Sequence, residues 1–142
     1  MKCQIFINMK FIEILNEMVN HPFPNKKHII IKNSEGDEFN IECEYAKTPQ
    51  EKMTGVLGLD SMCQNCGVIF DEISPTYYHM NGVKFPLDMI FCDADGTILN
   101  IVEAQPDGDN VYPPSGSEFN IEVNGGFCEK NNINKGDIVY VS

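Results

Sequence analysis

The chain has 142 residues, a length that predicts one domain with a core large enough to need neither metal nor disulfide staples. It carries 21 acidic residues against 10 basic ones, which gives a formal net charge of −11. Such a surface repels phosphate backbones and anionic lipid, so the charge argues against binding to nucleic acid or to a membrane. Hydrophobic residues make up 42% of the chain, which argues against wholesale disorder.

The first 24 residues predict a helical extension rather than an export signal. Phe11, Ile14 and Met18 recur at helical spacing, and Glu13 and Glu17 interrupt any longer apolar run. No stretch of the chain approaches the roughly 18 apolar residues that a membrane helix needs. We therefore expect an intracellular protein, and the sequence leaves a place in a viral particle open.

From His28 onward the hydrophobic period changes to 2, which predicts β-strands. The stretches "HIIIKN" and "EFNIECEYA" predict an antiparallel hairpin around the turn "SEGD", with one apolar face and one wet face. A short helix is expected next, because Thr48 can cap it and Pro49 suits the first helical position.

The rest of the chain predicts further short strands. "CGVIFDEI", "TYYHM" and "FNIEV" are three of them, and "LDMIFC" and "TILNIVEA" form a second hairpin around residues 93–96. A loop over residues 104–118 is longer than a connection requires, and a helical turn and a final strand follow "NGG". Seven or eight short strands predict a mainly β domain over residues 28–142, built as a single-domain β-sandwich or a partly closed β-barrel.

Six stretches in order give the chain a family resemblance. They are "AKTPQEKMTGVLG", "CGVIF", "HMNGVKFPLDMIFCDADGTILNI", "YPPSG", "NIEVNGG" and "INKGDIV". Together they resemble the uncharacterised family called domain of unknown function 192, over roughly residues 29–141. The resemblance implies a compact, mainly β domain of sandwich or barrel type, and it implies no reaction.

Asp88 is the residue that the pattern explains least, because it lies inside an otherwise apolar strand. A buried carboxylate needs a charged partner or several N–H donors. Asp88 could fasten loop backbone to the sheet, near Met80 and Asn81 or near Tyr112. Alternatively, it could be a pocket carboxylate that binds a ligand or moves a proton beside His79. Asp88, His79, Met80, Asn81 and Tyr112 are therefore the candidate ligand-binding residues.

The chain has six cysteines, and without an export signal we expect free thiols. Cys63 and Cys66 have the two-residue gap of half a zinc site or of a redox dithiol, or they are unrelated loop cysteines. A structural zinc would need two more ligands, from Cys92, Cys128 or His79. We predict no cofactor, with zinc at Cys63 and Cys66 as the alternative.

These observations favour a non-catalytic β module that binds a small molecule or another protein. The long 104–118 loop and the neighbourhood of Asp88 would form its binding surface, and no assembled catalytic group indicates an enzyme. One alternative is a hydrolase that uses Asp88 with His79. The other is a zinc or redox protein that uses Cys63 and Cys66.

Overall fold

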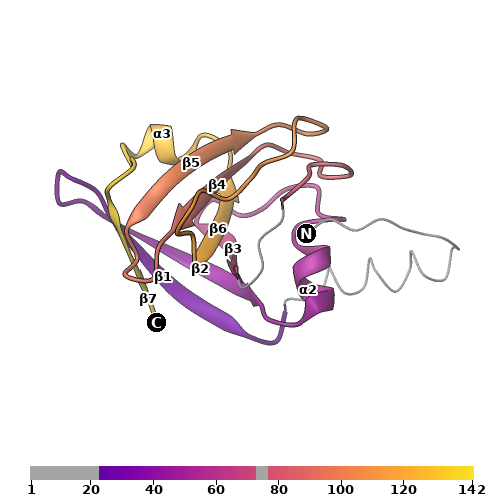
Figure 1. The fold of residues 1–142 in the computed structure, drawn as a ribbon, viewed down its shortest axis with the longest axis horizontal. Helices are drawn as coiled ribbons and strands as arrows, with labels where there is room; N and C mark the ends of the chain where they lie inside the picture. The colour runs from indigo at the N-terminus through magenta and orange to yellow at the C-terminus, as the bar shows by residue number, and fades with distance from the viewer. Residues whose placement is uncertain (1–22, 73–76) are drawn as a thin grey trace, which may run out of the picture.

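The computed structural model describes residues 23–72 and 77–142, so the predicted helix around Phe11–Met18 lies outside the described residues. Within them, seven strands form one continuous sheet in the order β5-β4-β6-β3-β2-β1-β7. The sheet curls on itself into a partly closed barrel (Figure 1), which confirms the mainly β prediction and selects the barrel over the sandwich. The elements are β1 (Lys26–Lys32), β2 (Glu38–Ala46), α2 (Pro49–Thr54), β3 (Cys66–Asp71), β4 (Leu87–Cys92), β5 (Ile98–Ala104), β6 (Phe119–Asn124), α3 (Phe127–Lys130) and β7 (Ile138–Val141).

The first predicted hairpin is present as β1 and β2. Ile29 pairs with Ile41 and both are fully buried, whereas Glu42, the next residue along β2, is exposed. The β2–β3 pairing is parallel, so the chain must cross over between these two strands. The crossover contains α2, whose Thr48 side chain accepts from Glu51 N at 3.1 Å while the Glu51 carboxylate accepts from Thr48 N at 3.0 Å. The capped helix that the sequence predicts after Thr48 is therefore confirmed.

Two separate cores lie on the two faces of the sheet. The inner core fills the barrel and includes Ile29, Ile90 and Ile121. The outer core includes Phe70 and Met89, and it covers the outer face of β3, β6 and β4 with side chains from the 47–64, 77–86 and 105–118 segments. Because β4 is covered on both faces, all six of its residues are buried.

The barrel closes where β7 meets the turn between β4 and β5. Val139 N donates to Gly96 O at 2.8 Å, and Ile98 N donates to Asp137 O at 2.9 Å. Gly96 has a φ of +87°, and a Cβ atom at this position would lie 2.2 Å from the Val139 carbonyl oxygen. Only glycine therefore permits this close approach of the two backbones.

No helix within residues 23–72 and 77–142 is long and apolar enough to span a lipid bilayer.

Replacing Gly96 with alanine tests the closure of the barrel. We expect Gly96→Ala to lower the free energy of unfolding by about 2–4 kcal/mol, because it adds a backbone clash to the cost of a left-handed conformation. Gly36→Ala is the matched control, since Gly36 has a φ of +88° but open space around the added Cβ. It should cost only about 1 kcal/mol. Equal losses of unfolding free energy for the two variants in urea would contradict a close backbone contact between Gly96 and Val139.

Candidate functional site

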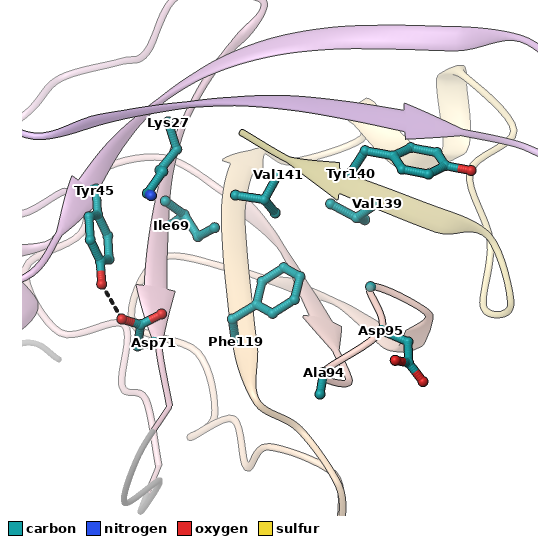
Figure 2. Close-up of a pocket in the computed structure, with 11 residues that line it drawn as sticks. Lys27, Tyr45, Ile69, Asp71, Ala94, Asp95, Phe119, Val139, Tyr140 and Val141 are labelled. Atoms are coloured by element: carbon teal, nitrogen blue, oxygen red, sulfur yellow. Dashed lines mark hydrogen bonds between the residues drawn. The ribbon is translucent and has the colours of Figure 1, made fainter.

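The two ends of the barrel differ. At one end α3 is inserted as a plug: the Phe127 ring contacts the Phe39 ring edge-on, with centroids 6.3 Å apart, and Asn33 Nδ2 donates to Asn131 O at 3.1 Å. At the opposite end, where β2 and β3 finish and β6 begins, a pocket of about 440 Å³ opens. Figure 2 shows this pocket between β1, β3, β6, β7 and the turn after β4.

The floor of the pocket is apolar. Ile69 and Val139 belong to the inner core and are 4% and 3% exposed. Above them, the Phe119 ring faces Val141 across the pocket (Figure 2). The pocket is thus the exposed top of the inner core, which no element within residues 23–72 and 77–142 covers at this end of the barrel.

One wall of the pocket is polar. Lys27 Nζ lies 5.3 Å from the centroid of the Tyr45 ring, and the Tyr45 hydroxyl donates to the Asp71 carboxylate (Figure 2). That hydrogen bond, with burial and the charge of Asp71 adding to it, raises the pKa of Tyr45 to about 12, so Tyr45 remains a donor at neutral pH. Among the described residues, Lys27 forms no ion pair.

Asp88 occupies the other, plugged end of the barrel. It is 2% exposed, and its two carboxylate oxygens accept from Gly126 N at 3.1 Å and from Cys128 N at 2.9 Å. It therefore fastens the start of α3 to β4. The sequence suggested a fastening role beside residues 80–81 or near Tyr112, but the structure places its partners at Gly126 and Cys128. Met80 is buried in the outer core, and Asn81 is exposed.

His79 and Tyr112 lie in the outer layer, away from Asp88. Tyr77 lies between them, with its ring centroid 6.4 Å from that of His79 and 5.8 Å from that of Tyr112. Tyr112 is 64% exposed. Asp88 shares the inner face of β4 with Ile90, whereas the 77–86 segment packs on the outer face. The structure therefore does not bring Asp88 and His79 together as a hydrolase would require.

A buried acidic group beneath the long loop was missed by the sequence analysis. Glu72, at the end of β3, accepts from the Tyr78 hydroxyl at 2.6 Å and from the Ser117 hydroxyl. Val111 pairs with the backbone of Tyr78, so the 105–118 segment is packed onto the sheet along part of its length. Burial raises the pKa of Glu72, although the two hydroxyl donors work in the opposite direction. A carboxylate directly after an apolar strand is the signal that could have identified it.

Two polar residues of β6 are also buried, although the alternation of "FNIEV" predicts a wet face for them. Asn120 and Glu122 are both 0% exposed, because the outer layer covers this face of the sheet. Within the described residues, neither polar atom of the Asn120 side chain has a hydrogen-bond partner. Burial and the hydrogen bond to Glu72 raise the pKa of Tyr78, and the nearby charge of Glu122 raises it further.

The expectation of free thiols is wrong for one pair. Cys63 and Cys66 form a disulfide, with their Cα atoms 5.2 Å apart. Cys43, Cys92 and Cys128 are free and buried, and burial raises the pKa of all three, that of Cys43 to about 12. Buried thiols of this kind are poor nucleophiles. In residues 23–72 and 77–142, no three His, Cys, Asp or Glu side chains are grouped to hold a metal ion.

The fold and the site define a small partly closed β-barrel with one plugged end and one open end. The family model for domain of unknown function 192, described as an uncharacterized ACR, matches residues 30–141. The chain belongs to this family, whose function is unknown, and the resemblance noted in the sequence is confirmed.

Two solved structures share the fold. One is a candidate transcription regulator from Sinorhizobium meliloti 1021, with a TM-score of 0.79 and 24% identity, over 85% of this chain and 97% of that chain. The other is a protein of unknown function from Novosphingobium aromaticivorans, with a TM-score of 0.73 and 23% identity, over 80% and 83% of the two chains. At these identities the likeness shows the fold alone. No curated protein matches the chain.

The role of Asp88 can be tested by Asp88→Asn. We expect the free energy of unfolding to fall by about 3 kcal/mol, because an amide nitrogen would face a backbone N–H where a carboxylate oxygen now accepts. Asp109→Asn, in the exposed part of the long loop, is the matched control and should change stability by less than about 0.5 kcal/mol. Urea unfolding of both variants provides the comparison. If the two variants are equally stable, the fastening role is wrong.

Glu72 should make stability depend on pH. Because its pKa is raised in the folded state, Glu72 binds more protons when folded than when unfolded, so its contribution to stability falls as the pH rises above the unfolded value near 4.5. Glu72→Gln removes this titration. Relative to the variant, the wild-type protein should lose stability as the pH rises from the unfolded value near 4.5 through the raised pKa of the folded state, measured by thermal unfolding. A constant difference between the two proteins over this range would contradict the assignment.

Proposed function

We propose that the protein is a non-catalytic binding module that takes a small organic molecule into the open end of the barrel. The ligand would have an apolar body and an anionic end. The observation that carries the proposal is the pocket itself, about 440 Å³ in size, with an apolar floor and the half-buried Lys27 ammonium on one wall. Small-molecule sites commonly combine an apolar lining with a few polar groups of this kind.

The two parts of the pocket support different parts of the ligand. Phe119, Val139 and Val141 offer contact to an apolar body: Val139 belongs to the inner core, Phe119 packs against it, and Val141 is an exposed apolar side chain beside them.

Lys27 is the positive charge in the lining and has no ion pair within the described part of the chain. Of the two carboxylates in the lining, Asp71 accepts from Tyr45 and Asp95 is exposed on the turn after β4. The anionic end of the ligand would therefore have to lie on the Lys27 side of the pocket. An anionic group beside Lys27 would gain a charge-assisted hydrogen bond.

The other surfaces support this role less well. Asp88 has both oxygens committed to backbone N–H groups, and part of the long loop is tied down through Val111 and Ser117. The net charge of −11 supports a small ligand over nucleic acid or a membrane, and we propose that the protein works inside a cell. The regulatory description of the Sinorhizobium meliloti protein therefore does not guide our proposal.

Binding of anilinonaphthalene sulfonate tests the proposal, because this dye combines an aromatic body with one anionic group. We expect saturable binding to the folded protein, seen as increased dye fluorescence, and amide shifts in two-dimensional NMR at Ile69, Phe119 and Val139. Lys27→Met keeps the aliphatic stem and removes the charge. It should weaken the binding about tenfold, as expected for the loss of one charged hydrogen bond.

Lys135→Met is the matched control, because Lys135 is exposed and lies outside the pocket lining. Its dye affinity should equal that of the wild-type protein. Amide shifts that map to another face of the molecule would show that the open end is not the site. Equal affinities of the Lys27→Met and Lys135→Met proteins would remove Lys27 from the ligand contacts.

A further inference from the structure

The disulfide of Cys63 and Cys66 lies outside the barrel, in the turn that leads into β3 and far along the sheet from the open end. Cys63 is exposed, and Cys66 is half-buried at the first position of the strand. Both cysteines line a second pocket of about 470 Å³, whose apolar walls include Leu59, Met62 and Val68. A thiol or a short extended segment can therefore approach the sulfur of Cys63 from solvent.

The turn is held in place without the disulfide. Cys66 N donates to Cys63 O at 3.2 Å, and Glu42 N donates to Asn65 O at 3.0 Å. The Asn124 side-chain amide, at the end of β6, donates to Cys63 O at 3.0 Å. These hydrogen bonds keep the two cysteines adjacent, so the fold does not need the covalent bond, which closes a loop of only four residues.

We propose that Cys63 and Cys66 form a reversible redox site that exchanges with a dithiol reductant. A thiolate of the reductant attacks Cys63 Sγ, the sulfur–sulfur bond breaks, and Cys66 leaves as a thiolate and takes up a proton. The second thiol of the reductant then attacks the reductant's first sulfur, which is bonded to Cys63 in the mixed disulfide. Cys63 is released as a thiolate and is protonated. The protein gains two electrons and two protons, and the dithiol becomes a disulfide.

The charges around the site suit a switch better than a rapid catalyst. The carboxylates of Glu42 and Glu44 line the same pocket, where Glu44 is paired with the Lys26 ammonium at 3.0 Å and Glu42 with the His28 ring at 2.6 Å. Among the described lining residues, no unpaired positive charge therefore stabilises the thiolate on which exchange depends. The site would therefore be oxidised in an oxidising compartment and reduced in a reducing one, with the shape of the second pocket changing between the two states.

Native alkylation tests the proposal, with Cys3→Ser in every protein so that Cys3 contributes no thiol. Before reduction, iodoacetamide should label no cysteine of the folded protein, because Cys43, Cys92 and Cys128 are buried. After brief treatment with dithiothreitol, intact mass should show two carbamidomethyl groups, and peptide mapping should place them on Cys63 and Cys66. The Cys63→Ser/Cys66→Ser protein, treated in the same way, should remain unlabelled.

Reversible reduction of the disulfide distinguishes a redox site from a disulfide that only stabilises the fold. The reduced protein should keep its circular dichroism spectrum, and its thermal midpoint should fall by no more than about 10 °C. Oxidised dithiothreitol should restore the unlabelled state. Labelling of the pair before reduction, resistance of the pair to dithiothreitol until urea is added, or unfolding on reduction would each overturn the proposal.

Single variants test which sulfur is attacked. In Cys66→Ser the exposed Cys63 is left as a free thiol, and in Cys63→Ser the half-buried Cys66 is left. Cys63 should react with iodoacetamide about tenfold faster than Cys66, since the reaction follows the accessibility of the thiolate. Equal rates would overturn the assignment of Cys63 as the sulfur that the reductant attacks.

Discussion

The contact on which the barrel depends is a carboxylate that binds two backbone N–H groups. Asp88 is buried in a strand whose two faces are both covered, and its charge is tolerated because Gly126 N and Cys128 N donate to it. These bonds hold α3 against β4, and α3 in turn closes one end of the barrel. Because the plug is at that end, the opposite end exposes the top of the inner core. The position of the candidate ligand pocket thus follows from the end of the barrel at which the Asp88 carboxylate binds the N–H groups of α3.

The outer layer also buries polar side chains, but not all of them have hydrogen-bond partners in the described part of the chain. Long segments cover the outer face of β3, β6 and β4, and they bury Glu72, Asn120 and Glu122 in doing so. Glu72 receives two hydroxyl donors and ties these segments to the sheet, whereas the Asn120 side chain has no hydrogen-bond partner within the described residues. A buried amide without partners costs stability, which the apolar contacts of the surrounding outer core must offset.

The open end of the barrel and the Cys63–Cys66 turn are separate features of the molecule. The pocket at the open end belongs to the inner core and depends on barrel closure at Gly96 and Val139. The disulfide lies at the start of β3, beside a pocket that β1, β2 and β3 form together with the crossover segment. The two pockets have different lining residues, but Lys27, Tyr45 and Ile69 of the first directly follow Lys26, Glu44 and Val68 of the second along β1, β2 and β3.

The sequence by itself determined seven of the strands, the α2 cap and the family, because these depend on local signals: alternation with a period of 2, Thr48 before Pro49, and motifs in a fixed order. The prediction of a strand at "TYYHM" was wrong for its described residues, 77–80, which form only an isolated bridge between Tyr78 and Val111.

The sequence also indicated that Asp88 must have buried donors. Only the tertiary structure decided which donors these are, since Gly126 is 38 residues away along the chain. The burial of Asn120 and Glu122 was likewise decided only by the tertiary structure. Alternation shows that two faces differ, but whether distant segments cover the polar face depends on packing that no local pattern encodes.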